Sequence, residues 1–116
     1  MLLDADDQKK LQRKALEVRD AYLALASATD TYRTTLRSAL GSAASSDLLA
    51  PYKKQAKGLR QAAEGVSDYR RALKSADAEL ARRGLAKMAR AEALMKQAGA
   101  ELDAAAGTDT TTTQLF

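Results

Sequence analysis

The sequence predicts an all-α fold: a two-helix antiparallel coiled-coil hairpin with a long overhanging second helix and an extended C-terminal tail. Three observations predict it. The composition is rich in Ala and Leu and has a single Pro, apolar residues recur at alternating steps of four and three, and one short polar stretch interrupts them. A chain of 116 residues leaves room for one domain.

The first helix is expected over about residues 5–40. Asp4 can cap its N-terminus, because its carboxylate can accept a hydrogen bond from a backbone N–H of the first turn. Gly41 follows as a candidate C-cap, since glycine readily adopts the left-handed conformation found there. The apolar positions form an unbroken heptad series, here named the first seam: Leu11, Ala15, Val18, Tyr22, Leu25, Thr29, Tyr32, Leu36 and Ala39.

A second helix is expected over about residues 48–106, after a small, polar turn at residues 41–47. Pro51 is tolerated only near its start, because proline has no N–H to donate. The heptad spacing continues along this helix, with two successive steps of four at Gly84 that relax the supercoil. Whether one helix continues through Gly84 stays open. The hairpin as a whole comprises residues 1–107.

The second helix is longer than the first, so its last turns should extend beyond the first helix. An apolar stripe without an intramolecular neighbour usually marks an interface. The tail, residues 108–116, is rich in Thr and ends in apolar residues. It is expected to be extended or disordered, because threonine has poor helix propensity. The candidate protein interface consists of Met88, Ala91, Leu94, Met95, Ala98, Leu102, Leu115 and Phe116.

The four tyrosines all lie at heptad positions of the two helices. We expect them to pack in the core with a solvated hydroxyl and not to act as catalytic phenols. An antiparallel pairing would place Tyr22 beside Val66, and Tyr32 beside Leu59.

Positive charge is concentrated in residues 53–90 of this chain, whose formal net charge is +4. Basic side chains that recur at steps of three and four could line an anionic partner such as a phosphate backbone. Alternatively, these basic side chains form only a solvated flank of the coiled coil. No aromatic side chain is free to stack on bases, so binding to nucleic acid should be weak. The candidate polyanion contacts are Arg71, Lys74, Arg83, Lys87 and Arg90.

The chain contains no His and no Cys, which excludes Ser-His and Cys-His catalysis and thiolate or imidazole zinc sites. The carboxylate pairs Glu64–Asp68 and Glu101–Asp103 come with no third ligand or base nearby in sequence. No glycine motif for phosphate binding is present. The sequence therefore predicts no catalytic, cofactor-binding or metal site, no small-molecule substrate, and no enzyme.

No apolar run approaches the ~20 residues that cross a bilayer, and the acidic start lacks the features of a Sec signal peptide. We expect a cytoplasmic protein, or one incorporated into a virion or other assembly. The expected partners are further copies of the chain and another protein. The best-fitting function is a non-enzymatic structural or assembly protein, such as a virion, scaffold or secretion-assembly component. The alternative is a small basic helical protein that binds nucleic acid or another polyanion without sequence specificity.

Overall fold

A computed structural model describes residues 4–41 and 46–114, and the side chains of residues 4–41 and 49–105. Within these ranges the fold is all-helical and contains no strand, which confirms the all-α part of the prediction. Three helices are present, α1 (Ala5–Leu40), α2 (Ser46–Ser75) and α3 (Ala78–Gln114), where the sequence predicts two.

The N-terminus of α1 is capped as the sequence predicts. Asp4 has an extended backbone, and its Oδ1 accepts a hydrogen bond of 2.8 Å from the backbone N–H of Asp7. At the other end, Gly41 has a φ of 57° and donates its N–H to the carbonyl oxygen of Arg37. These two contacts satisfy backbone groups that a helix end otherwise leaves without a partner.

The predicted second helix is interrupted between α2 and α3. Ala76 has a φ of 54°, and the backbone N–H of Asp77 donates to the carbonyl oxygen of Ala72, which is the hydrogen-bond pattern of a helix that ends in a left-handed residue. Asp77 then caps α3, because its Oδ1 accepts from the N–H of Leu80 at 3.1 Å. The prediction of a single helix over residues 48–106 is therefore wrong: one residue ends α2 and the next begins α3.

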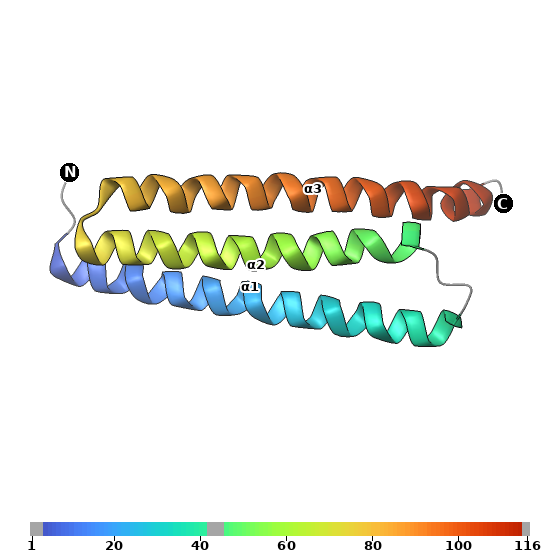
Figure 1. Cartoon of the computed structure of the whole chain (residues 1–116), viewed down its shortest axis with the longest axis horizontal. Helices are drawn as coiled ribbons and strands as arrows, with labels where there is room; N and C mark the ends of the chain where they lie inside the picture. The colour runs from blue at the N-terminus through green and yellow to red at the C-terminus, as the bar shows by residue number, and fades with distance from the viewer. Residues whose placement is uncertain (1–3, 42–45, 115–116) are drawn as a thin grey trace.

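This turn also removes the predicted overhang, because α3 folds back along α2 (Figure 1). The structure differs from the sequence prediction at the C-terminus as well. Helix α3 continues to Gln114, whereas an extended tail is expected from Thr108; a formed helix can extend through poor helix formers because elongation costs far less than nucleation. Leu115 and Phe116 lie outside the described residues.

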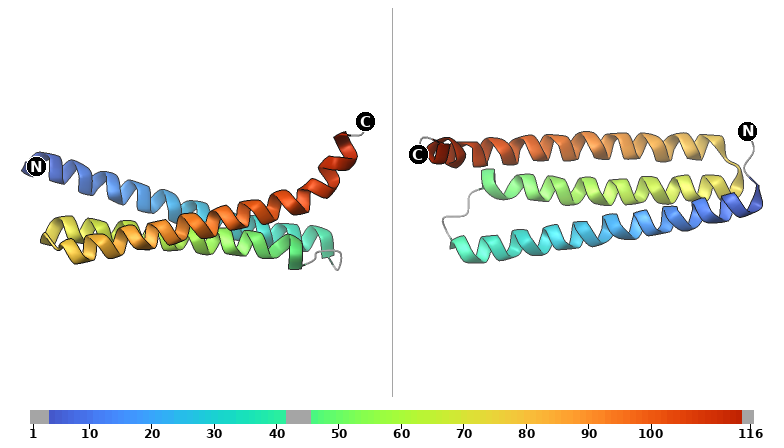
Figure 2. Two further views of the ribbon diagram at one scale, coloured as in Figure 1. Left: turned by 90° about the horizontal axis from the view of Figure 1, so that it is seen from above. Right: turned by 180° about the vertical axis from the view of Figure 1, so that it is seen from behind.

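The three helices form a single, strongly twisted layer with α2 in the middle and α1 and α3 on either side of it (Figure 1), and seen from above α1 and α3 cross at an angle (Figure 2). Neighbouring helices run in opposite directions. Contacts join α2 to both flanking helices, but among the described residues no Cα atoms of α1 and α3 come within 8 Å of each other. The molecule measures 58 × 27 × 23 Å with a radius of gyration of 18.3 Å, whereas a compact chain of this length would have about 13 Å.

Small residues allow α2 and α3 to approach closely. They recur every seven residues on both helices: Pro51, Gly58, Gly65 and Ala72 on α2, and Gly84, Ala91 and Ala98 on α3, all buried. A Cβ built on Gly65 would lie 2.7 Å from the carbonyl oxygen of Gly84, and a Cβ built on Gly84 would lie 2.7 Å from that of Gly65. The two backbones therefore meet at these glycines, where no larger residue fits.

The buried core consists mainly of alanines around α2, and its only buried large aliphatic side chains in the described ranges are Leu59 and Val66. Helix α1 buries one residue fully, Ala26. None of the helices, over their described residues, contains an apolar stretch that could cross a membrane.

Candidate functional site

The two sides of the helical layer have different chemistry. On one side of the α1–α2 contact, the rings of Tyr32 and Tyr52 meet edge to face with centroids 5.2 Å apart. On the other side, at a position about 200° around α1 from Tyr32, Asp30 of α1 forms an ion pair with Arg60 of α2. We name these sides the apolar face, which carries Tyr32, and the basic face, which carries Arg60.

The apolar face carries a row of exposed large side chains on α1, named here the apolar stripe: Leu11, Val18, Leu25 and Tyr32. They are spaced seven residues apart, so they lie along one side of the helix. Their exposed fractions range from 36% at Leu11 to 54% at Leu25. Monomeric proteins rarely leave such a continuous apolar row in water.

The apolar stripe is one half of the first seam predicted from the sequence. The other half packs toward α2: Ala15, Tyr22, Thr29 and Leu36 are all partly buried. The side of α1 that packs on α2 also includes residues outside the predicted seam. Ala26 is buried there, and Gln12, Arg19 and Arg33 are partly buried. The prediction that all four tyrosines belong to the core is accordingly wrong for Tyr32, which is 53% exposed.

The apolar face continues onto α3. Leu85 is 51% exposed and lies two residues from Lys87, a rotation of about 200° around the helix. Lys87 binds Glu64 on the basic face, so Leu85 points toward the apolar face. Met88 and Met95 lie between it and α2, partly buried, with their Cγ atoms against Gly65 and Gly58.

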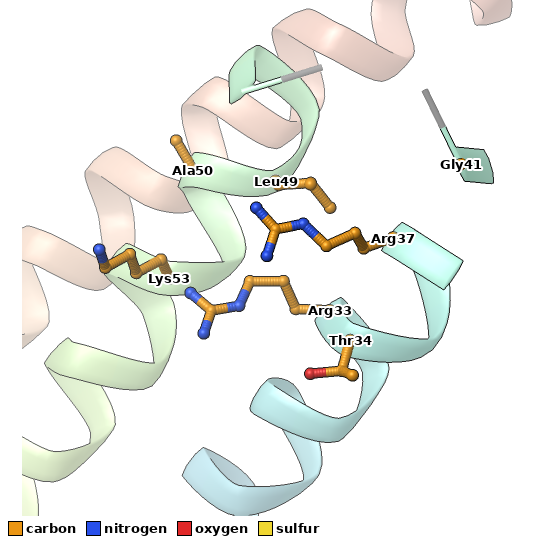
Figure 3. A pocket seen from close by; sticks show the side chains of 7 residues that line it. All are labelled: Arg33, Thr34, Arg37, Gly41, Leu49, Ala50 and Lys53. Carbon is orange, nitrogen blue, oxygen red and sulfur yellow. The ribbon is translucent and has the colours of Figure 1, made fainter. Parts of the chain in front are cut away.

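On the basic face, a groove follows the contact between α1 and α2, and its cationic side chains are Arg33, Arg37, Lys53, Lys57 and Arg60. We name this feature the basic groove. It consists of two adjoining pockets of about 480 and 410 Å³ that share Arg33 and Lys53. In the first pocket, Arg33 and Arg37 reach from α1 toward Lys53 of α2 (Figure 3).

The basic groove contains more positive than negative charge. Arg33 lies 3.7 Å from Asp30, and Arg60 is paired with the same carboxylate. Neither Arg37 nor Lys53 forms an ion pair with a carboxylate among the described side chains. A third pocket, of about 270 Å³, continues from Gln61 and Glu64 to Lys87 and Arg90 of α3. The line of pockets thus extends across all three helices.

Asp68 is the one buried charged residue in the described ranges, at 4% exposure. Lys87 donates to its Oδ2 at 2.6 Å, and Arg71 donates to its Oδ1. The hydrogen bond from Lys87 lowers the pKa of Asp68, against the opposing effect of burial, and the same bond raises the pKa of Lys87. Glu64 also binds Lys87, at 3.1 Å. The Glu64–Asp68 pair is therefore a binding site for a lysine of the same chain.

The predicted interface residues do not form one exposed stripe. Ala91 and Ala98 are fully buried, at 0% exposure, because α3 packs onto α2 at these positions. The remaining described members are partly buried: Met88, Leu94, Met95 and Leu102. Leu115 and Phe116 are outside the described residues. The apolar surface that the structure leaves open lies mainly on α1.

The predicted polyanion contacts occupy different environments. Arg71 and Lys87 are held by Asp68. Arg90 lines the third pocket, and Lys74 and Arg83 are exposed near the α2–α3 turn. The basic groove also contains Arg33 and Arg37 of α1, which the sequence prediction missed because they belong to another helix. The available signal was the spacing of four residues between Arg33 and Arg37, which places both on one side of α1.

Among the described residues, no three acidic side chains gather into a group that could hold a metal ion. Comparisons with protein-family models, with curated proteins and with solved structures gave no match.

Proposed function

We propose that this chain is a non-enzymatic assembly protein whose apolar face packs against the apolar face of a second copy. The observation that carries this proposal is the apolar stripe of α1, exposed along a single helical layer. Protein domains generally consist of two or more packed layers around a common core. A second copy would provide the layer that one chain lacks.

The surface area of the chain supports this proposal. A compact monomer of 12.4 kDa would expose on the order of 6,100 Å², whereas this chain exposes 8096 Å². The excess is larger than the ~800 Å² that each partner contributes to a standard interface.

The sequence of α1 favours a helical partner. Three large residues of the stripe, Val18, Leu25 and Tyr32, alternate with small residues three positions further on, which are exposed as well: Ala21, Ala28 and Thr35. This alternation provides knobs and holes for a facing helix. Because the face of a second copy has the same pattern, a two-fold symmetric contact satisfies both chains at once.

Two variants of α1 test this proposal as a matched pair. Leu25→Glu places a charge on the apolar stripe, and Leu23→Glu places the same charge at a leucine that is 42% exposed but about 200° away around the helix. We expect Leu25→Glu to weaken association at least tenfold in sedimentation velocity, while Leu23→Glu associates like the unmodified chain. Equal association of all three proteins would contradict the proposed interface.

A further inference from the structure

The cations of the basic groove come from two helices and line one continuous recess. Arg33 and Arg37 are one helical turn apart on α1 and reach toward α2, and Lys53 lines the same pocket from α2 with its ammonium group directed away from them (Figure 3). Lys57 and Arg60 continue the row along α2. At 1.5 Å per residue, the cations of α2 from Lys53 to Arg60 span ~10 Å. With Arg33 and Arg37 alongside, the row is long enough to contact neighbouring phosphates.

The composition of the groove suits phosphate oxygens. Three of its five cations are arginines, whose planar guanidinium groups donate two parallel hydrogen bonds to an oxyanion. The carboxylate of Asp30 lies beside Arg33 and Arg60 and partly neutralises that end. Arg37 and Lys53 keep their charge available at the other end, within the part of the chain that is described. The cations of the first pocket are therefore the best placed to bind an anion.

We propose that the basic groove binds the phosphate backbone of a double-stranded nucleic acid, with Arg33, Arg37 and Lys53 as the primary contacts. Recognition is independent of base sequence, because the exposed tyrosine ring lies on the opposite, apolar face and the cations of the groove contact phosphates, which carry no sequence information. Recessed arginines fit discrete phosphates better than the broad surface of an anionic membrane. This site leaves the apolar face free, so it does not depend on the proposed self-association.

Fluorescence anisotropy with a labelled 20-base-pair DNA duplex provides the test. We expect saturable binding of the full chain, with a dissociation constant in the range of about 10⁻⁶ to 10⁻⁴ M at physiological salt. The triple variant Arg33→Gln, Arg37→Gln, Lys53→Gln should bind at least tenfold more weakly at low salt. Loss of three phosphate contacts should also make the slope of log K against log salt shallower by about 2 to 3.

A control variant removes the same number of charges elsewhere. Lys9, Lys10 and Arg13 are exposed on the first turns of α1, and their replacement by Gln gives a protein with the same net charge as the groove variant. The control should retain the binding and salt slope of the unmodified chain. Circular dichroism and sedimentation velocity would show that all three proteins have equal helix content and equal association.

Three results would overturn the proposal. One is the absence of saturable duplex binding at 50 mM salt, and another is an equal loss of binding in the control and groove variants. The third is a preference for vesicles of anionic phospholipid over the duplex at equal phosphate concentration, which would assign the groove to a membrane surface. Each is independent of the result for Leu25→Glu, so failure of this site and failure of the self-association interface can be distinguished.

Discussion

Gly65 of α2 and Gly84 of α3 lie against each other, each with its backbone carbonyl 2.7 Å from the place where the Cβ of the other would be. Glycine normally weakens a helix by about 1 kcal/mol relative to alanine. Both glycines are nevertheless placed within long helices, because they allow the two backbones to touch. The two glycines thus lower the stability of each helix locally but allow α2 and α3 to pack closely.

We expect Gly84→Ala to destabilise the fold by about 1 to 3 kcal/mol, because its new Cβ would overlap the backbone of α2. The control is Gly99→Ala, also within α3, where nothing lies within 4 Å of the added Cβ. That change should stabilise the protein by about 0.5 to 1 kcal/mol. Urea unfolding followed by circular dichroism measures both, and stabilisation by Gly84→Ala would show that the two backbones are further apart than described.

Replacing Ala76, in the turn between α2 and α3, should raise or lower the stability of the protein depending on whether the turn is present. Ala76 has a φ of 54°, a conformation that costs alanine about 1 kcal/mol and glycine almost nothing. Ala76→Gly should therefore stabilise the protein by about 0.5 to 1 kcal/mol. If residues 48–106 formed one continuous helix, the same change would destabilise it by a similar amount. Ala86→Gly, at an exposed position inside α3, is the matched control and should destabilise.

The pair formed by Asp68 and Lys87 predicts a defined dependence of stability on pH. The pKa of Asp68 is lowered from its ordinary 3.8, mainly by the hydrogen bond from Lys87. The contribution of Asp68 to the stability of the fold is therefore complete above pH ~4 and is lost as the pH falls through the lowered pKa. The pKa of Lys87 is raised from 10.5, mainly by the bond to Asp68, so its contribution is lost only as the pH rises beyond that value.

Asp68→Asn should cost about 1 to 3 kcal/mol at pH 7, because it removes the charge that two donors of the same chain bind. The difference from the unmodified protein should shrink as the pH is lowered toward 2. Urea unfolding between pH 2 and 7 measures this difference in the free energy of unfolding. Asp103→Asn, at an exposed carboxylate of α3, should have little effect, and a pH-independent cost at Asp68 would contradict the charged pair.

The helical class could be predicted because composition and apolar spacing are local properties, and so could the cap at Asp4. The break at Ala76 could not be recognised by the usual signals. Glycine is the common residue where a helix ends in the left-handed conformation, and alanine, the best helix former, occupies that position here. A different signal was present in the small residues, whose seven-residue spacing from Gly58 to Ala72 is repeated from Gly84 to Ala98.

The functional surfaces depend on tertiary structure and were only partly predictable. The heptad pattern of α1 marks Leu25 and Tyr22 equally, but α2 covers the side with Tyr22 and leaves Leu25 exposed. Arg37 and Lys53 likewise belong to separate helices and become neighbours only when these helices pack. Periodicity shows which residues share one side of a helix; it does not show which side finds a partner.

The mass of the unmodified chain in solution tests the central claim most directly. Sedimentation equilibrium over a range of about 1 to 500 µM would determine it without a label or a mutation. We predict a mass of at least twice the 12.4 kDa of one chain in the upper part of that range, because the apolar faces of two copies cover one another. A mass of 12.4 kDa throughout would contradict self-association.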